Sequence, residues 1–271
     1  MNLNQKTVIV TGGARGIGAA MARRFAAEGA NVVVADLDKS TADATAATLN
    51  GLAFACDVTN ENDIIALVAA AESHFGQVDM FCSNAGVCFG EPSHAASASN
   101  ETWNRCWDVH VMSHVYAARA VLPGMISRGD GYLLQMSSAA GLLNQIGDAA
   151  YSASKHAALG FAESLAITHA DEGIKVSVIC PQYVSTSMLG YAEGESADDV
   201  PGVITVEEVA ETVMQGVVEE SFLILPHADV AQYIQFKSAD HDKWLTAMRR
   251  LRSKIVNDIG STDPVQMHRL V

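Results

Sequence analysis

The sequence contains no long hydrophobic run and few basic residues. No apolar stretch approaches the roughly 18 consecutive residues that a membrane-spanning helix requires, and the one near the N-terminus is too short for a signal peptide. Lys and Arg number 17 against 31 Asp and Glu, which gives a formal net charge of −14 at pH 7. Nucleic acid and anionic membranes would repel such an acidic chain. We therefore expect a cytoplasmic protein with neither as a partner.

Cysteine is scarce as well. Five cysteines, an odd number, are scattered over 271 residues without any Cys-x-x-Cys pair. That pattern indicates neither a disulfide framework nor a zinc knuckle. Isolated cysteines of this kind behave as small hydrophobic side chains. We expect the five thiols to be reduced and mostly buried.

The sequence does have a regular alternation of short apolar runs with helix-length segments. The runs are continuously hydrophobic, which is typical of strands buried on both faces of a parallel sheet. The alternation predicts an α/β fold with a single Rossmann-type domain, a doubly wound parallel sheet of about seven strands, over residues 5–226. The expected strands are 7–11, 31–37, 52–58, 79–86, 132–138, 175–180 and 221–226.

Two segments fall outside this alternation. Residues 187–204 are acidic and contain glycine, and we expect a mobile loop there. Thr205 and Glu208 then form a capping box, which begins a helix. The chain ends in a helical extension, 228–271, in which four apolar side chains at helical spacing share one face: Trp244, Met248, Leu251 and Ile255.

The extension differs in charge from the rest of the chain. Its stretch 237–254 holds six Lys or Arg and two Asp, a local charge of +4. An apolar helix face flanked by basic residues suits docking on a neighbouring subunit. We therefore expect a homodimer or homotetramer in which the extension is part of an interface.

A glycine-rich turn, TGGARGIG, follows the first expected strand and leads into a helix. Gly12, Gly16 and Gly18 let the backbone approach a pyrophosphate at the helix N-terminus. Asp36 ends the second strand, where an acidic side chain binds the ribose hydroxyls of NAD. The 2′-phosphate of NADP would be repelled there by about 1–4 kcal/mol, which Arg15 offsets only in part. The pattern favours NAD over NADP; an ordinary tight turn and a solvated carboxylate are the alternatives.

The stretch YSASK places Tyr151 and Lys155 four residues apart near the start of an expected helix, and so on one face. A lysine ammonium beside a phenol lowers the phenol pKa from about 10, which makes the tyrosine a usable general base. Ser138, at the end of the fifth strand, could hold a substrate oxygen against Tyr151. The alternative is an ordinary contact on a helix surface.

Together these motifs resemble the short-chain dehydrogenase/reductase family over about residues 5–226. TGGARGIG is similar to the family's TGxxxGxG, SNAG to its NNAG, and Asp57 with Val58 to its adenine-contacting pair. Ser138 and YSASK match its catalytic serine and YxxxK at the family's spacing. The resemblance implies cofactor contacts from Gly12, Arg15, Gly16, Ile17, Gly18, Asp36, Asp57, Val58, Asn84, Ala85, Gly86, Tyr151, Lys155, Pro181, Val184 and Thr186.

The resemblance also implies the reaction, which is hydride transfer between a nicotinamide cofactor and a carbonyl. Tyr151 would be the acid/base, Ser138 would hold the substrate oxygen, and Lys155 would bind the ribose and tune the tyrosine. The residues expected to face the substrate are apolar or aromatic and include no arginine, so we expect an alicyclic, aromatic or steroid-like alcohol or ketone. They are Leu142, Leu143, Ile146, Tyr183, Met188, Leu189 and Tyr191.

Two positions depart from the family's pattern. His110 stands where the family has a catalytic asparagine, with Ser113 in place of a nearby glycine. Gln182 replaces the glycine that follows Pro181, while Thr186 keeps its usual place. These departures put in question the proton relay and the fine positioning of the cofactor, but not the fold.

Cys106, His110 and His114 are spaced four apart and would form a stripe along one helix. Eight residues of helix span about 12 Å, whereas zinc ligands lie about 2 Å from the metal, so the three cannot share one ion. No further ligand for the two histidines is evident, and a purely structural stripe is the alternative. We favour His110 as a proton relay that titrates near its ordinary pKa of about 6.5, and interpret His114 as structural.

The sequence thus predicts an NAD-dependent dehydrogenase that interconverts a hydrophobic secondary alcohol and its ketone. One alternative is an NADPH-type ketoacyl reductase, which Asp36 and the net charge disfavour because an acidic carrier protein needs a basic docking surface. Another is an NAD-binding regulatory protein with lapsed chemistry. His110 and Gln182 would permit it, whereas the intact catalytic motif argues against it.

Overall fold

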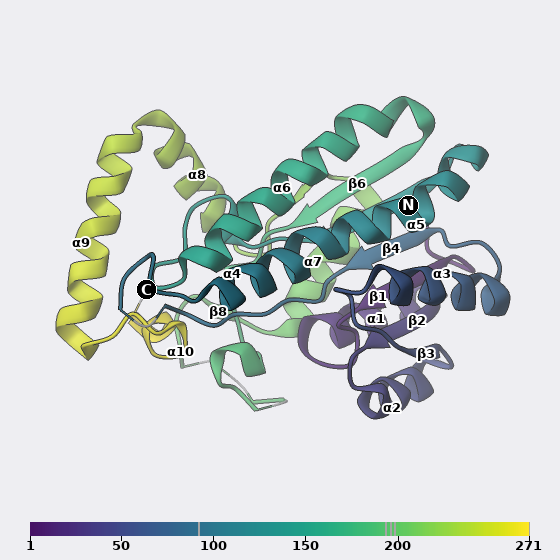
Figure 1. The fold of residues 1–271 in the computed structure, drawn as a ribbon, viewed down its shortest axis with the longest axis horizontal. Coiled ribbons are helices and arrows are strands. Elements are labelled where there is room, and N and C mark those ends of the chain that lie inside the picture. Colours follow the sequence, from purple (N-terminus) through teal and green to yellow (C-terminus); the bar gives the residue numbers. More distant parts are fainter. Residues whose placement is uncertain (92, 193, 196, 198, 271) are drawn as a thin grey trace.

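The computed structural model describes residues 1–91, 93–192, 194–195, 197 and 199–270. Its centre is a parallel seven-stranded sheet in the order β3-β2-β1-β4-β5-β6-β9, so the chain starts in the middle and winds outward in both directions (Figure 1). This order confirms the predicted doubly wound α/β fold. The strands are β1 (Thr7–Thr11), β2 (Asn31–Asp36), β3 (Leu52–Ala55), β4 (Met80–Ser83), β5 (Gly131–Met136), β6 (Ile174–Ile179) and β9 (Leu223–Ile224).

The central strands form where the sequence is continuously apolar, because both faces of the sheet are covered. Every residue of β1, β4 and β5 is buried. β5 and β6 pair in register from Gly131 opposite Ile174 to Met136 opposite Ile179. A second sheet of two short strands, β7 (Tyr183–Val184) and β8 (Val203–Ile204), lies in the segment that follows β6.

Helices cover both faces of the sheet and create two hydrophobic cores. α1, α2 and α7 bury one face around Met21 and Phe25, and α3, α5 and α6 bury the other around Leu67 and Met125. The predicted capping box of Thr205 and Glu208 begins α7. The helices are α1 (Gly16–Ala27), α2 (Lys39–Leu49), α3 (Glu61–Phe75), α4 (Asn100–Trp107), α5 (Ser113–Arg128), α6 (Ala149–His169), α7 (Val206–Glu219), α8 (Asp229–Ala239), α9 (His241–Ile259) and α10 (Pro264–Met267).

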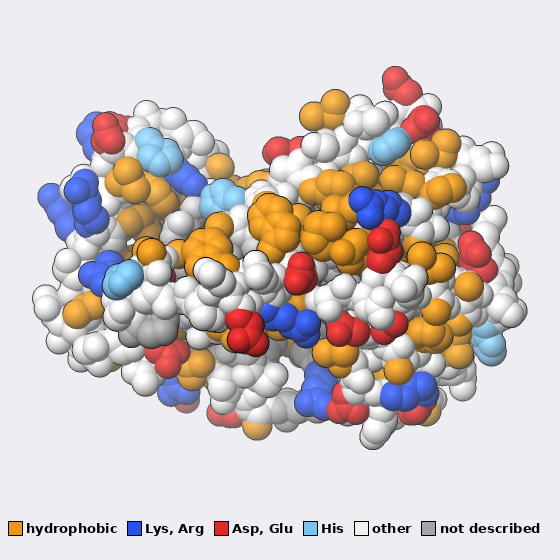
Figure 2. Space-filling model, viewed as in Figure 1, with side chains coloured by type: hydrophobic (Ala, Val, Ile, Leu, Met, Phe, Trp, Pro, Cys, Tyr) orange, Lys and Arg blue, Asp and Glu red, His pale blue; other side chains and the backbone are white. Residues whose placement is uncertain are grey.

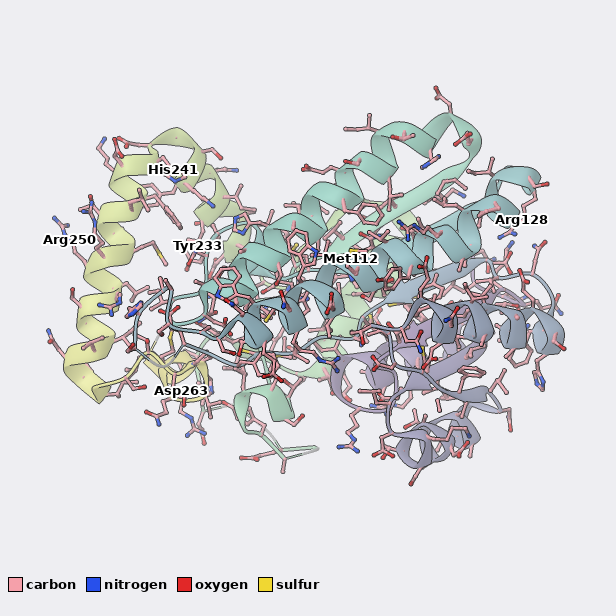
Figure 3. The ribbon with its side chains drawn as sticks, viewed as in Figure 1. Met112, Arg128, Tyr233, His241, Arg250 and Asp263 are labelled. Carbon is pink, nitrogen blue, oxygen red and sulfur yellow. The ribbon has the colours of Figure 1, made fainter. Side chains whose placement is uncertain are left out.

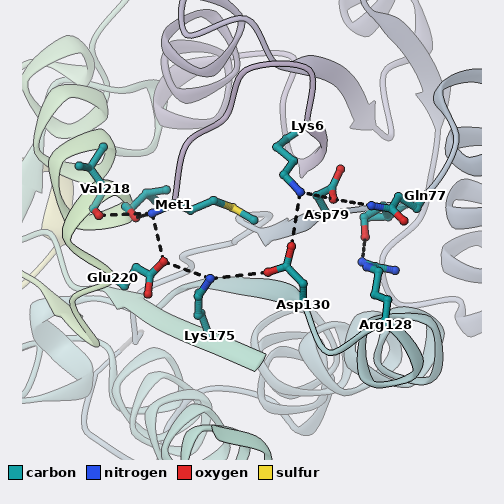
Figure 4. Close-up of polar contacts among 11 residues, drawn as sticks. Met1, Lys6, Gln77, Asp79, Arg128, Asp130, Lys175, Val218 and Glu220 are labelled. Carbon is teal, nitrogen blue, oxygen red and sulfur yellow. Dashed lines mark hydrogen bonds and ion pairs between the residues drawn. The ribbon is translucent and has the colours of Figure 1, made fainter. Parts of the chain in front are cut away.

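A row of ion pairs links the amino ends of five strands (Figure 4). Lys6 Nζ lies 2.9 Å from Asp79 and 3.4 Å from Asp130. Lys175 Nζ lies 3.6 Å from Asp130 and 3.1 Å from Glu220. Each exposed pair contributes only about 0–1 kcal/mol. The row occupies the edge of the sheet opposite the carboxyl ends, where ligands bind in folds of this kind.

The C-terminal extension forms a helical hairpin, α8 and α9, beside the body of the fold, and α10 then returns toward it (Figure 1). Trp244 and Ile255 are buried on the predicted apolar face of α9. Residues 187–204, expected to be a loop, hold a 3₁₀ turn at Ser187–Leu189 and strand β8, and 193, 196 and 198 lie outside the described residues. Within the described chain, no helix is both long and apolar enough to cross a bilayer.

Candidate active site

A cavity lies beyond the carboxyl ends of β1, β2, β4, β5 and β6, beside the point where the strand order reverses. Every residue that the sequence predicted to contact the cofactor lines it. Ser138, Tyr151 and Lys155 line it as well. His110 does not, because it is fully buried behind Gly86, where a Cβ would lie 3.7 Å from its Nε2 atom.

The glycine-rich turn after β1 is shaped to receive phosphate groups. Gly16 has a φ of +53°, and a Cβ there would meet only Thr186 within 4 Å. A Cβ on Gly18 would lie 2.1 Å from the Gly12 carbonyl oxygen, so only glycine lets α1 pack against the turn. Arg15 precedes α1 without a side-chain cap from the described residues. The first N–H groups of α1 are therefore available to an anionic ligand.

Asp36 supplies the negative charge at the end of β2. Its Oδ2 accepts a hydrogen bond from the Ala14 N–H at 3.2 Å, and its Oδ1 accepts one from the Asp38 N–H at 3.2 Å. The Arg15 guanidinium pairs with Asp38 and donates to Thr41 Oγ1 at 3.1 Å. Because Asp38 neutralises Arg15, this arginine is already paired and the Asp36 carboxylate dominates its end of the cavity.

Asn84, in the SNAG stretch after β4, holds the turn against the sheet. Its Nδ2 donates to the carbonyl oxygens of Thr11 at 2.9 Å and Gly12 at 3.1 Å. Its N–H donates to Thr11 Oγ1 at 3.0 Å. A Cβ on Gly12 would lie 2.9 Å from the Ala85 Cα. The two motifs therefore form one surface, although about seventy residues separate them.

Ser138, Tyr151 and Lys155 meet where β5, α6 and the segment after β6 converge. Lys155 Nζ lies 5.5 Å from the centre of the Tyr151 ring and donates to the Met136 carbonyl at 3.1 Å. The Ser138 hydroxyl donates to the Pro181 carbonyl at 3.3 Å. A hydroxyl, a phenol and an ammonium thus share one cavity with the glycine-rich turn.

Burial sets the protonation states of this group. Removal from water raises the pKa of Tyr151 above its ordinary value, and hydrogen bonding to Ser138 opposes that rise. Removal from water also lowers the pKa of Lys155 to about 8. In the chain alone Tyr151 is a neutral phenol at pH 7 and Lys155 is mostly protonated. The sequence predicted that Lys155 lowers the pKa of Tyr151; in the structure burial raises it instead.

Asp148 fixes the start of the helix that carries Tyr151. One carboxylate oxygen accepts the Tyr151 N–H at 3.0 Å, which caps α6. The other accepts the N–H groups of Phe89 at 3.2 Å and Gly90 at 2.8 Å, and the Cys88 thiol at 3.4 Å. This buried carboxylate therefore joins the loop after β4 to the catalytic helix.

His110 lies in a wide π turn, Asp108–Met112, that precedes α5. Its Nε2 accepts the Val87 N–H at 3.0 Å, so its Nδ1 carries the hydrogen and donates to Ser154 Oγ at 2.8 Å. The Ser154 hydroxyl donates in turn to the Tyr151 carbonyl at 2.9 Å. Burial, with a smaller effect from Lys155, lowers the His110 pKa well below 6.5. The prediction that His110 titrates near neutrality is therefore wrong.

His114, one turn further along, is also buried, and no described residue hydrogen-bonds to either of its ring nitrogens. Burial lowers its pKa to about 3. Neutral His114 contributes fully to the free energy of unfolding above the unfolded-state pKa of about 6.5. This contribution is lost as the pH falls below that value, because the unfolded chain then binds a proton that the folded chain does not bind. The loss amounts to about 1.4 kcal/mol for each pH unit.

We therefore expect His114→Leu to flatten the acid side of the stability profile. Urea unfolding at pH 7.5, 6.0 and 5.0 would give a free energy of unfolding that falls less steeply for His114→Leu than for the parent. His74→Leu, at an exposed position on α3, is the control and should keep the parent slope. Parallel profiles for all three proteins would contradict the assignment.

On the substrate side, Tyr183, Met188 and Leu189 line the cavity as predicted. Leu142 and Leu143 do not, because the Lys237 ammonium of α8 binds their carbonyl oxygens at 2.8 and 2.9 Å and α8 covers this stretch. The structure thus does not bring these two residues to the cavity, and their contact with substrate stays a prediction.

Ile146 and Tyr191 are also absent from the cavity lining. The carbonyl of Ile146 accepts the Gln145 side chain at 3.0 Å, and Gln145 is the residue of this loop that lines the cavity. Tyr191 is buried beneath the C-terminal residues, with its hydroxyl 2.8 Å from His268 Nε2. The structure therefore does not bring Ile146 and Tyr191 to the cavity either, and their contact with substrate stays a prediction.

Three residues that the sequence did not single out complete the substrate side: Cys88, Gln145 and Pro264. Cys88 lies two residues after the SNAG stretch, and Gln145 lies between Leu143 and Ile146, which were predicted to face the substrate. Their positions along the chain could therefore have identified both. Pro264 comes from the end of the chain, and no motif marks it.

Gln182 lines the cavity, and its backbone is held in place. Its N–H donates to His227 Nδ1 at 3.1 Å, and His227 Nε2 donates to the Tyr183 carbonyl at 3.0 Å. His227, just after β9, therefore fixes the segment in which Gln182 replaces the family's glycine.

Comparisons with known proteins agree with this geometry. A family model described as short chain dehydrogenase matches residues 6–196. Oxidoreductase UcpA of Salmonella typhimurium is 33% identical over 269 residues, covering 97% of this chain and 96% of its own. The 1-deoxy-11-beta-hydroxypentalenate dehydrogenase of Streptomyces exfoliatus is 32% identical over 252 residues, covering 90% of each chain.

A solved structure agrees as well. The crystal structure of a short chain dehydrogenase/reductase from Burkholderia phymatum in complex with NAD superposes with a TM-score of 0.80 at 25% identity, covering 89% of this chain and 96% of that one. With the parallel sheet, the glycine-rich turn and the Ser–Tyr–Lys group in one cavity, these matches agree on one conclusion. The chain belongs to the short-chain dehydrogenase family of oxidoreductases.

Proposed function

We propose that this protein is an NAD-dependent dehydrogenase that interconverts a neutral, hydrophobic secondary alcohol and its ketone, with a single cofactor-binding and catalytic domain. The proposal rests on one observation. Ser138, Tyr151 and Lys155 line the same cavity as the glycine-rich turn and Asp36. A phosphate cradle and an acid/base group in one cavity suit hydride transfer at a carbonyl carbon.

The cavity fits a nicotinamide dinucleotide. The open N-terminus of α1 suits the pyrophosphate, and Asp36 suits the ribose hydroxyls. Because Arg15 is already paired with Asp38, little positive charge is left for a 2′-phosphate. These contacts favour NAD over NADP.

The proton steps belong to the chain's own residues. Bound in the cavity, NAD supplies the acceptor for the hydride that leaves the alcohol carbon. In oxidation Tyr151 acts as the phenolate: its own proton first leaves to solvent, and the phenolate then takes the hydroxyl proton. In reduction the phenol gives its proton to the ketone oxygen. Ser138 holds that oxygen by a hydrogen bond, and the Lys155 ammonium stabilises the phenolate form of Tyr151.

His110 acts in this scheme as a positioning residue. It stays neutral, and its two ring nitrogens join the loop at Val87 to Ser154 of α6. Its ring also packs edge-on against the Tyr151 ring, with 5.3 Å between the ring centres. His110 therefore holds Tyr151 in position by packing against its ring. The sequence had suggested instead that His110 titrates and relays a proton.

Among the described residues, the substrate side carries no charged side chain. The charged residues that line the cavity are Arg15, Asp36, Asp57, Arg105 and Lys155, which belong to the cofactor side or to the catalytic group. Tyr183, Met188, Leu189 and Pro264 offer apolar surface, and among the described residues a carboxylate or a phosphate ester would find no cationic side chain there.

The test is a panel of neutral secondary alcohols incubated with the protein and NAD, followed by absorbance of the reduced cofactor. Alicyclic and aromatic alcohols should be oxidised, and matched hydroxy acids should not. If no alcohol is oxidised while NADH still binds, the regulatory alternative with lapsed chemistry takes precedence. Preference for NADPH and an acyl thioester would support the ketoacyl reductase alternative.

Homo-oligomerisation is part of the proposal. Hydrophobic side chains cross the middle of the face over α4, α5 and α6 (Figure 2), and Trp107 is 48% exposed there. On α9, the exposed Arg249, Arg250, Arg252 and Lys254 form no ion pair with any described residue, and Arg250 points away from the rest of the chain (Figure 3). A second copy of this acidic chain would supply both apolar contacts and negative charge.

Reversing charge on α9 should therefore weaken the assembly. We expect Arg249→Glu/Arg250→Glu/Lys254→Glu to lower the mass measured by light scattering at a concentration where the parent is a dimer or tetramer. Lys39→Glu, on the exposed surface of α2, is the control. An unchanged mass for the triple variant would exclude α9 from the interface.

We also place the protein in the cytoplasm. The five cysteines are all free, and four of them are buried. Free thiols persist in a reducing compartment. Fractionation of cells that produce the protein would test this placement.

A further inference from the structure

We propose that the C-terminal wall, which is the segment 261–268, closes the substrate side of the cavity within its own chain and limits the size of the substrate. The inference rests on the proposed function, because it concerns the substrate side of the same cavity. The segment lies beyond residues 6–196, which the family model matches. Pro264 from this segment lines the cavity together with Cys88, Gln145, Met188 and Leu189.

Three loops around the substrate side each present a glycine to the C-terminal wall. A Cβ on Gly147 would lie 2.0 Å from the Thr262 carbonyl oxygen, which no side chain could tolerate. A Cβ on Gly190 would lie 3.1 Å from Val265 Cγ1, and one on Gly90 would lie 3.7 Å from Pro264 Cδ. All three glycines have φ between +71° and +84°. The loops after β4, β5 and β7 are thus shaped to receive the wall closely.

Buried side chains anchor the wall. His268 is fully buried, and its Nδ1 donates to the Pro264 carbonyl at 3.1 Å while its Nε2 accepts the Tyr191 hydroxyl at 2.8 Å. Met267 is 1% exposed, with its sulfur 3.8 Å from Gln145 Nε2. The two residues secure the wall to the loops at 145 and 191, on either side of the cavity.

The wall is also rigid at the point where it meets the cavity. Pro264 is the first residue of α10, a position in which its fixed φ suits a helix start. Asp263, labelled in Figure 3, caps this helix by accepting the Val265 N–H at 2.9 Å. Asp148 holds the loop at Gly90, which contacts Pro264, against α6. Because the wall and the loop that contacts it are both held in place, the Pro264 ring sets a steric limit that side-chain motion cannot relax.

The first test is a substrate-size profile in the full-length chain. Pro264→Ala removes ring atoms from the wall, and a hydrophobic pocket discriminates by about tenfold or more for such a change. We expect the ratio of kcat/KM for cyclododecanol to that for cyclohexanol to rise about tenfold. The KM for NAD should stay within a factor of about two, because Pro264 belongs to the substrate side and not to the glycine-rich turn or Asp36.

Two further variants separate the wall from general stability. Tyr191→Phe removes only the hydroxyl that His268 accepts, and it should shift the size ratio in the same direction. Gln266→Ala, at an exposed position on the same helix, is the matched control and should leave the ratio unchanged. Equal ratios for Pro264→Ala, Tyr191→Phe and the parent would overturn the inference.

A second readout needs no activity. Cys88 lines the cavity and is the one cysteine of the five that is not fully buried. Burial raises the pKa of the Cys88 thiol to about 12 and makes it slow to react in the parent. Its modification by Ellman's reagent should be faster in Pro264→Ala than in the parent or Gln266→Ala, and the added reaction should be lost when Cys88→Ser is combined with Pro264→Ala. Equal rates in Pro264→Ala and the parent would count against the wall. If no alcohol is oxidised, the proposed function fails, and this readout still decides whether the wall closes the cavity.

Discussion

Replacing Tyr151 with phenylalanine is expected to abolish alcohol oxidation while leaving NADH binding nearly intact. Only the hydroxyl that carries the proton is lost, and loss of a general acid/base costs about 10²–10⁴ in rate. Asp148 still caps α6 in this variant, because the cap is made to the backbone N–H of residue 151. Initial rates with saturating alcohol and NAD measure the oxidation activity, and a fluorescence titration measures the affinity for NADH.

The control for this prediction is Tyr233→Phe, at an exposed tyrosine on α8, which should keep full activity. If Tyr151→Phe retains more than a few per cent of the parent rate, Tyr151 is not the acid/base. A loss of NADH binding in the same variant would show that the substitution disturbs the site as a whole.

Replacing Asp36 with alanine should have the next largest effect, on the choice of cofactor. The parent should prefer NAD over NADP by at least about tenfold in kcat/KM, because a 2′-phosphate near Asp36 is repelled by about 1–4 kcal/mol. Asp36→Ala should narrow that preference. Asp38→Asn should also narrow the preference for NAD, because the substitution weakens the ion pair that Asp38 forms with Arg15.

Asp43→Asn is the control for the cofactor experiment, since Asp43 pairs with Lys39 on α2. It should leave the NAD preference as in the parent. Equal use of both cofactors by the parent would overturn the role of Asp36. A preference that survives in Asp36→Ala would assign cofactor selection to another residue.

The fold and the cofactor side could be predicted because their signals are local. β1, β4 and β5 are continuous apolar runs, and such runs identify strands that helices cover on both faces. The contacts around Gly12, Asp36 and Asn84 lie in short motifs that directly follow strands. Parallel strands bring their carboxyl ends to one edge, so motifs far apart in sequence meet there.

The substrate side could not be predicted in the same way, because distant loops build it. Leu142 and Leu143 were expected to face the substrate, but Lys237 of the C-terminal extension covers their stretch. Pro264 reaches the cavity only because three glycine-containing loops accept the C-terminal wall. The family resemblance assigned His110 to the catalytic group, but it could not reveal the burial that keeps the imidazole neutral.

The most direct test of the account follows the hydride itself. The protein is incubated with NAD and cyclohexanol that carries deuterium on the hydroxyl-bearing carbon, and the reduced cofactor is analysed by mass spectrometry. With the parent, we expect the deuterium to appear in the reduced cofactor. Tyr151→Phe should yield almost no reduced cofactor. Reduced cofactor without deuterium, or no reduced cofactor from any neutral secondary alcohol, would contradict it.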